Sequence, residues 1–148
     1  MATNKSFERL SQLTLLAPTG VNIASGAACL FGRKEITGDP YPAACVAQEA
    51  QNTTNPPYDP NTGYLSFDFE GGYTLTVLAE TLGSPSAGAA INTGDAIYYS
   101  GGTYDPTSGI TYGGTLCRDT NGTFFGRAMA PVLAGTSAII TVMLRNSA

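Results

Sequence analysis

Residues 64–78 read YLSFDFEGGYTLTVL, and they decide the fold class because apolar and polar side chains alternate through them. Successive side chains of a β-strand point to opposite faces of a sheet, so a period of two predicts strands that each bury one face. The alternation stops at Glu70-Gly71-Gly72 and then resumes. Two glycines can adopt the positive φ angles of a tight primed turn. The stretch therefore predicts a β-hairpin whose turn lies at residues 70–72.

Seven more segments carry a strand pattern, and turn residues separate them. Eighteen glycines and nine prolines interrupt every long window of the 148-residue chain, so no segment has a strong helical period. Short strands joined by turns are typical of a β-sandwich or a small β-barrel. We therefore predict a single all-β domain over residues 13–148, preceded by an extended N-terminal arm at residues 1–12. The further strands are expected within residues 13–16, 26–33, 43–50, 95–100, 110–117, 123–130 and 138–145.

Two turn signals stand out among the connections. Asn121-Gly122 is the strongest two-residue hairpin signal, and it predicts a second hairpin between the strands on either side. The pattern Tyr-Asp-Pro-x-x-Gly occurs at residues 58–63 and again at residues 104–109. In such a turn the aspartate accepts hydrogen bonds from the next amides, proline presets φ, and glycine provides a left-handed exit. These acids are therefore predicted to bend the chain.

A shorter echo links the two halves of the chain. Residues 25–28 read Ser-Gly-Ala-Ala and residues 93–96 read Thr-Gly-Asp-Ala, and an expected strand follows each of them. Two copies are too few for a solenoid, whose repeats bury a core only by stacking. The echo indicates a β unit that occurs twice.

The charge balance excludes several partners. The net charge is −4, only 12% of residues are charged, and the seven basic residues are scattered along the chain. Nucleic-acid binding needs a concentrated positive face, so no nucleic-acid partner is expected. No apolar run approaches the roughly 20 residues of a membrane helix, and the N-terminus lacks the apolar segment of a signal peptide. We expect synthesis in a reducing cytoplasm, with Cys29, Cys45 and Cys117 as buried small hydrophobic residues.

Catalytic and metal-binding residues are hard to find in this sequence. It has no histidine, which is the most common general base and metal ligand near neutral pH. Asp59, Asp105 and Asp119 lie in turn contexts. The loops YDPNTG, at residues 58–63, and RDTNGT, at residues 118–123, both lack the full ligand spacing of a calcium loop. We therefore expect no enzymatic activity, no catalytic residue, no metal site and no cofactor.

Tyrosines gather around one stretch, at residues 98, 99, 104 and 112. Amphipathic tyrosine suits a protein interface, and an aromatic row on a sheet is also the usual carbohydrate platform. Core packing of alternate tyrosines is a third interpretation. The absence of tryptophan weakens the carbohydrate interpretation. Tyr98, Tyr104 and Tyr112 are the candidates for contact between subunits.

The order of motifs resembles the phage capsid cement, or head decoration, family. In that family a small-Gly-Asp-x-(Val or Ile) step begins a strand, and a Gly-(Val, Ile or Arg)-Ala strand follows. An Ala-Gly-Thr segment then leads into a closing strand of the form (Ile or Val)-x-Val-x-Leu. Here these steps fall on residues 93–99, 126–130 and 134–144. The match is best over the last third of the chain and looser at residues 13–33, where the corresponding step lacks its acid.

This resemblance implies a β-domain without enzymatic activity on the outer surface of an icosahedral head. Such proteins are typically homotrimers that sit where capsomers meet and brace the shell, so the major capsid protein would be the partner. The implied location is the virion, after synthesis in the host cytoplasm. A carbohydrate- or receptor-binding β-module of a tail or spike remains the alternative.

The N-terminal segment at residues 3–16 is the candidate for contact with the shell. Its start is polar, and its late strand has no obvious local partner. We expect Lys5, Phe7, Arg9 and Leu10 to make this contact.

Overall fold

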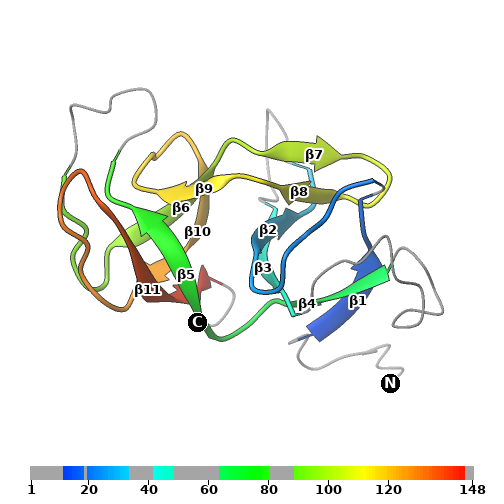
Figure 1. Cartoon of the computed structure of the whole chain (residues 1–148), viewed down its shortest axis with the longest axis horizontal. Helices are drawn as coiled ribbons and strands as arrows, with labels where there is room; N and C mark the ends of the chain where they lie inside the picture. Colours follow the sequence, from blue (N-terminus) through cyan, green and yellow to red (C-terminus); the bar gives the residue numbers. More distant parts are fainter. Residues whose placement is uncertain (1–11, 19, 34–41, 49–63, 81–88, 146–148) are drawn as a thin grey trace, which may run out of the picture.

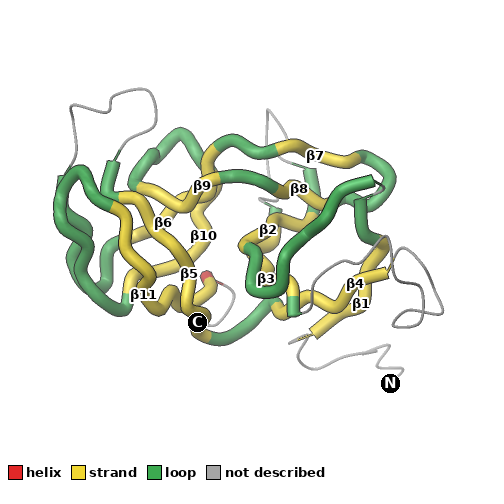
Figure 2. The backbone as a smooth tube through the Cα atoms, in the orientation of Figure 1, coloured by secondary structure: helices red, strands yellow, loops and turns green. Residues whose placement is uncertain are grey.

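The computed structural model describes residues 12–18, 20–33, 42–48, 64–80 and 89–145, and these residues form two antiparallel sheets (Figure 1). The predicted all-β fold is confirmed, and of the two predicted architectures, a β-sandwich or a small β-barrel, the two sheets form the sandwich. Strands dominate the described chain, as the yellow segments of Figure 2 show. The first sheet contains, in spatial order, β1 (Gln12–Leu16), β4 (Tyr64–Asp68), β3 (Ala43–Ala47), β2 (Ala28–Phe31), β8 (Ile110–Tyr112) and β7 (Thr103–Asp105). The second sheet contains β5 (Gly72–Leu78), β11 (Ser137–Leu144), β10 (Thr123–Ala128), β6 (Ala96–Ser100) and β9 (Thr115–Cys117).

The first sheet is buried on both faces at its centre, so it separates two cores. Ala44 and Val46 of β3 join the inter-sheet core, which also contains the inward side chains of the second sheet. The alternate residues Cys45 and Ala47 join a far core on the opposite face, together with Phe67 of β4. These four of the five β3 residues are therefore all buried, whereas a strand with one solvated face would show alternating burial.

The hairpin predicted at residues 64–78 does not form. Its two strands exist with the predicted alternation, but β4 pairs with β1 and β3, whereas β5 pairs with β11 in the other sheet. The chain crosses between sheets at Gly71, whose φ is +115°. Tyr73 secures this crossing, because its hydroxyl donates a 3.0 Å hydrogen bond to the Glu70 carbonyl. The glycines thus redirect the chain instead of folding it back.

Every Gly-Gly pair in the sequence marks a passage between the sheets. The chain crosses at residues 71–72 from β4 to β5, at residues 101–102 from β6 to β7, and at residues 113–114 from β8 to β9. The single strand predicted at residues 110–117 is wrong, because the last crossing divides this segment into two short strands, β8 and β9, in different sheets. Figure 1 shows β7 and β8 extending together from the second sheet to the first.

The hairpin predicted at Asn121-Gly122 is also wrong, although the turn is present. The N–H of Gly122 donates a 2.9 Å hydrogen bond to the Asp119 carbonyl, and Asp119 accepts a second one from the N–H of Asn121. The flanking strands β9 and β10 do not pair, because β6 lies between them and pairs with both. A local turn signal fixes the bend but not the strand partner.

The second Tyr-Asp-Pro turn forms as predicted and joins β7 to β8. The carboxylate of Asp105 accepts hydrogen bonds from the N–H and the hydroxyl of Ser108, at 3.1 Å and 2.6 Å. Gly109 leaves the turn with φ +76°. The first copy, at residues 58–63, lies outside the described residues.

The echoed β unit is confirmed, and the structure contains a third copy of it. In each copy a turn places glycine at positive φ, at Gly26, Gly94 and Gly135. Each glycine N–H donates to a buried alanine carbonyl, and the N–H of that alanine donates to the carbonyl of the residue after the glycine. These are the hydrogen bonds of a β-bulge that begins with a left-handed glycine. The alanines are Ala47, Ala128 and Ala79, which follow or end the strands paired with β2, β6 and β11.

A buried aliphatic residue lies three positions before each of these glycines. Ile23, Ile91 and Val132 are 4%, 0% and 2% exposed. Two of them also pair directly, because the backbones of Ile91 and Val132 exchange two hydrogen bonds of 2.9 Å. The unit is therefore an aliphatic anchor, a turn, a glycine bulge and a strand.

The strand predicted at residues 13–16 is confirmed as β1, and its partner is distant in the sequence. β1 pairs with β4 over five residues, from Gln12 opposite Asp68 to Leu16 opposite Tyr64. Gln12, the last residue of the predicted arm, therefore belongs to the first sheet together with residues 13–16. The remainder of the predicted arm lies outside the described residues.

Candidate binding surfaces

The outer face of the second sheet exposes large apolar side chains. Ile139 is 71% exposed in the middle of β11, while its neighbour Ile140 is 6% exposed and faces the core. Met129, directly after β10, is 51% exposed. Its N–H donates a 2.9 Å hydrogen bond to the Thr141 carbonyl, which places Met129 diagonal to Ile139 on the same face.

An aromatic pair and a cation continue this face across β10 and β6. The rings of Tyr98 and Phe124 lie opposite each other with centroids 6.0 Å apart. The guanidinium carbon of Arg127 lies 5.5 Å from the Phe124 ring centroid, and Arg127 donates a 3.1 Å hydrogen bond to the Gly94 carbonyl. These two interactions hold the cation in place. We define the outer face of the second sheet by Thr74, Thr76, Tyr98, Phe124, Arg127, Met129, Ile139 and Thr141.

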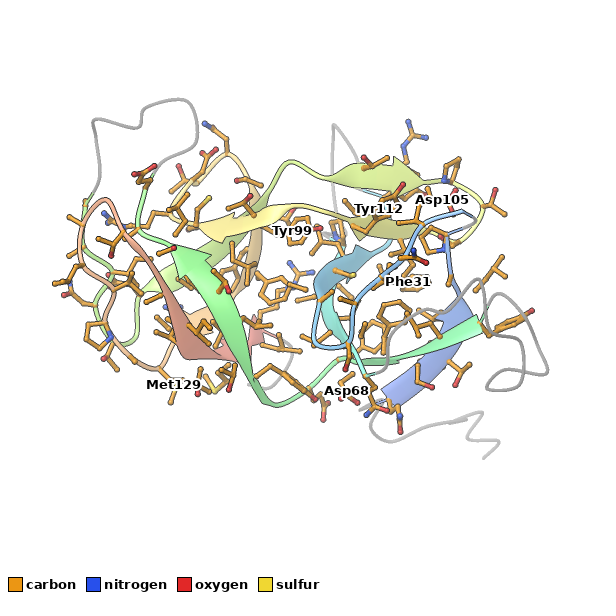
Figure 3. The ribbon with its side chains drawn as sticks, viewed as in Figure 1. Phe31, Asp68, Tyr99, Asp105, Tyr112 and Met129 are labelled. Atoms are coloured by element: carbon orange, nitrogen blue, oxygen red, sulfur yellow. The ribbon has the colours of Figure 1, made fainter. Side chains whose placement is uncertain are left out.

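The three tyrosines expected at a subunit contact do not share one surface. Tyr98 lies on the outer face of the second sheet and is half-buried. Tyr104 is 37% exposed on β7, at the edge of the first sheet. Tyr112 on β8 packs against the far core, and its position in the register puts it on the opposite face from Tyr104. Figure 3 shows Tyr112 over the first sheet and Met129 near the second.

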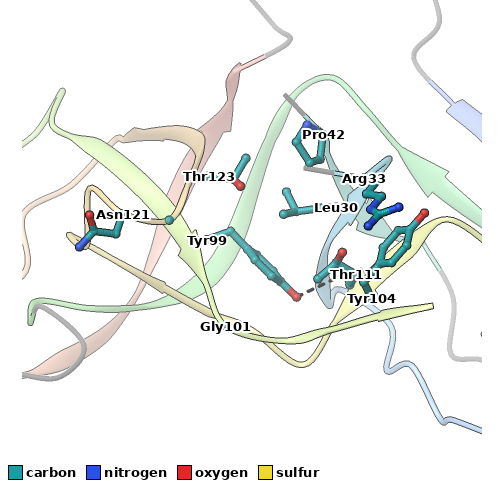
Figure 4. A pocket seen from close by; sticks show the side chains of 10 residues that line it. Leu30, Arg33, Pro42, Tyr99, Gly101, Tyr104, Thr111, Asn121 and Thr123 are labelled. Atoms are coloured by element: carbon teal, nitrogen blue, oxygen red, sulfur yellow. Dashed lines mark hydrogen bonds between the residues drawn. The ribbon is translucent and has the colours of Figure 1, made fainter. Parts of the chain in front are cut away.

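A pocket of about 320 Å³ opens between the two sheets (Figure 4). Leu30 and Thr111 of the first sheet and Tyr99 and Thr123 of the second line it. Arg33 and Tyr104 lie close together on one side of it. The Tyr99 hydroxyl is already engaged, because it accepts a 2.8 Å hydrogen bond from Gly114. A ligand would therefore meet ring faces, hydroxyl groups and one guanidinium.

The carboxylates near the predicted turns accept hydrogen bonds from backbone N–H groups, as expected for Asp105 and Asp119. Asp95 behaves in the same way, because it accepts a 2.8 Å hydrogen bond from the N–H of Asn92. The hydrogen bond from the Ser108 hydroxyl holds the pKa of Asp105 below its usual value. Within the described ranges, histidine, cysteine, aspartate and glutamate form no group of three that could hold a metal ion.

Several expected site residues lie outside the described part of the chain. Lys5, Phe7, Arg9 and Leu10, the candidates for shell contact, are among them, as is Asp59. The cysteines are described: Cys29, Cys45 and Cys117 are free thiols with 0% exposure, which confirms that they are buried.

The apolar residues of the outer face were missed by sequence reasoning. The sequence SAIITVML does contain a signal, because Ile139 lies between two apolar neighbours in a strand that should alternate. A run of apolar residues on both faces predicts burial on both sides or an exposed patch. Only the position of β11 in the sheet distinguishes the two.

The residues that carry the family resemblance have structural roles in this fold. Gly94 and Gly135 occupy the left-handed position of the repeated turn. Gly126 lies at a register shift in β10, where an added Cβ would collide with the Met143 carbonyl. None of the described residues belongs to a helix that is long and apolar enough to span a bilayer. Comparisons of the chain with known protein families, with curated proteins and with solved structures found no match.

Proposed function

We propose that this chain is a capsid cement protein that binds the outer surface of a phage head and stabilises the shell where capsomers meet. Its partners are the major capsid protein and, in a homotrimer, two further copies of itself. The observation that carries the proposal is the outer face of the second sheet. On this regular, hydrogen-bonded sheet Ile139 is 71% exposed and Met129 is 51% exposed.

A face of this kind is suited to adhesion. Its threonine, isoleucine and methionine side chains carry no charge, so covering them requires little desolvation of charge. The strands are already ordered by pairing on both sides of β11, so binding orders few additional groups. A standard interface buries roughly 1,600 Å² and varies widely in affinity. Many copies on one shell therefore matter more than the strength of a single contact.

Charge indicates the character of the shell surface. Arg127 is the one charged side chain among the residues that define the outer face, and it is held by Phe124 and the Gly94 carbonyl. The protein as a whole carries a net charge of −4. A neutral or acidic patch on the shell complements this face, whereas a basic patch would be repelled by the charge of Arg127.

The test is binding of purified protein to undecorated heads, measured by co-sedimentation. We expect Ile139→Asp to reduce the bound fraction at least tenfold, because it places a charge in the centre of the contact. Leu133→Asp is the matched control, since Leu133 is 77% exposed but lies in the turn beyond the sheet. Binding of Ile139→Asp equal to wild type would exclude this face. Failure of the wild-type protein to bind heads would reject the function itself.

Trimer formation has a separate test. Size-exclusion chromatography with light scattering at micromolar concentration should give three times the mass of one chain. A monomer at that concentration would contradict the trimer but leave the head-binding result to decide the function.

The inter-sheet pocket supports the alternative function, a carbohydrate- or receptor-binding module. Its volume of about 320 Å³ suits a small ligand, and Tyr99, Tyr104 and Arg33 provide ring faces and a cation. A glycan array separates the two functions. A specific signal that disappears in Arg33→Gln would favour the alternative, and a blank array together with head binding would favour cement.

A further inference from the structure

Cys29 and Cys45 face each other directly across β2 and β3. The register pairs them in the centre of the two strands, and both side chains belong to the far core. Directly opposite residues of antiparallel strands have Cα atoms about 4.5 or 5.5 Å apart, depending on the hydrogen-bonding pattern. Both separations fall within the roughly 4.4–6.8 Å over which disulfides occur. The sequence spacing of the two cysteines gave no sign of this pairing.

We propose that Cys29 and Cys45 are the site of a reversible cross-strand disulfide, formed when a peroxide oxidant reaches the folded or folding protein. The reduced protein has two thiols here, and the oxidised protein has one sulfur–sulfur bond that ties β2 to β3. This inference does not depend on the proposed function, because it rests only on the register and burial of the pair.

The reaction balances without any other reagent. One of the two cysteines, as its thiolate, attacks one oxygen of hydrogen peroxide, the O–O bond breaks, and a sulfenic acid forms; the departing hydroxide takes the proton that the thiol released and becomes water. The sulfur of the other cysteine then attacks the sulfenic sulfur, the S–O bond breaks, and the departing hydroxyl group takes the second thiol proton and leaves as water. Two thiols lose two electrons in total, and the peroxide gains them.

Burial controls how fast this oxidation can proceed. Burial raises the pKa of Cys29 to about 12, and burial, followed by the neighbouring Cys29, also raises the pKa of Cys45 above its usual value. Both thiols are therefore kept protonated near neutral pH. Both side chains have 0% exposure, so the oxidant enters through transient opening of the first sheet or acts before folding is complete. Oxidation of the native protein should consequently be slow.

The third cysteine provides the control. Cys117 lies in the second sheet on β9, opposite Tyr98, and it belongs to neither strand of the pair. The Cys117→Ala variant retains the proposed site and has no other thiol.

The experiment exposes the full-length Cys117→Ala variant to hydrogen peroxide and then unfolds it without reductant in the presence of an alkylating reagent. We expect the intact mass to fall by two hydrogen atoms with no alkyl group added, and added reductant should restore two alkylation sites. Cys29→Ala and Cys45→Ala, each made in the Cys117→Ala background, should stay alkylated at their remaining thiol or gain oxygen instead. If one of these variants fails to fold, the other provides the same comparison.

Thermal unfolding shows whether the bond is compatible with the fold. A disulfide between Cys29 and Cys45 should raise the Tm of the oxidised Cys117→Ala variant by roughly 6–12 °C, because the bond restricts the unfolded ensemble. Either of two results would overturn the proposal: retention of both free thiols after oxidation during refolding, or a disulfide-bonded product that is less stable than the reduced protein.

Discussion

The phenolic oxygen of Tyr99 accepts a 2.8 Å hydrogen bond from the backbone N–H of Gly114. The Tyr99 ring also occupies the position that a side chain at residue 114 would need. Tyr99 belongs to β6 of the second sheet, and Gly114 lies where the chain returns from β8 to β9. This crossing also passes close to the crossing at residues 101–102, which leads from β6 to β7. A Cβ on Gly102 would lie 2.7 Å from the Tyr112 carbonyl oxygen. Two passages between the sheets are thus packed together beside one tyrosine.

Replacing Gly114 tests how firmly this crossing is packed. We expect Gly114→Ala to lower the free energy of unfolding by about 1–3 kcal/mol, because its methyl group would overlap the buried Tyr99 ring. Gly72→Ala is the control at another crossing, where the nearest neighbour of the added methyl group is a side-chain methyl of Thr141 at 3.2 Å. Urea denaturation of both variants measures the difference. Equal stabilities would show that the Tyr99 ring can move aside.

The glycines of the repeated turn should be sensitive for a different reason. An added Cβ at Gly26 or Gly94 would meet nothing within 4 Å, so only the backbone opposes a side chain there. With φ at +79° and +92°, each alanine substitution should cost about 1–2 kcal/mol. Asparagine tolerates the left-handed region better, so Gly26→Asn and Gly94→Asn should lose less. Thermal unfolding ranks the four variants, and equal losses for alanine and asparagine would contradict this cause.

The buried thiols predict a loss of stability in alkaline solution. The pKa of Cys29 is raised from 9.0 to about 12, so between these values the unfolded chain releases a proton that the folded protein retains. The contribution of Cys29 is therefore fully present below pH 9 and declines as the pH rises toward 12, by about 1.4 kcal/mol per pH unit. Urea unfolding at about pH 8 and about pH 10.5 measures this decline. Cys29→Ala should lose less stability over this interval than Cys117→Ala, which retains Cys29.

The turn at Asp105 predicts the opposite dependence on the acid side. The Ser108 hydroxyl donates to the Asp105 carboxylate and lowers its pKa, so the folded state holds the ionised form more strongly than the unfolded state does. This contribution is present above the unfolded pKa of about 3.9 and is lost as the pH falls through the folded value. Asp105→Asn should therefore be less stable than wild type at neutral pH, and the difference should shrink in acid. A gap in Tm that stays constant between neutral and acidic solution would contradict this linkage.

Much of the local structure could be predicted from the sequence. The alternation around Leu65 and Phe67 predicted β4, and the alternation around Leu75 and Val77 predicted β5, because the two faces of a strand differ in their contact with water. The turn at Asp105 was predicted for an equally local reason, since its carboxylate bonds to amides within three residues. The burial of the cysteines followed from composition and spacing.

The candidate surfaces could not be predicted in the same way. Ile139 and Ile140 are adjacent and chemically identical, yet one is 71% exposed and the other 6%. Which of them faces the core depends on how β11 pairs with β5 and β10. The pairing of Cys29 with Cys45 likewise follows from the register of β2 and β3.

By itself the sequence determined where strands form, where the chain bends and which acids the turns engage, because each of these depends on neighbours a few residues away. Only the tertiary structure decided that a Gly-Gly pair carries the chain to the other sheet, as at Gly71, instead of reversing it into a hairpin. The physical reason is that a positive φ is a local property, whereas the partner of a strand is chosen by hydrogen bonds and apolar contacts with distant segments. β5 satisfies its backbone against β11, whose paired residues lie 59 to 71 positions later in the chain.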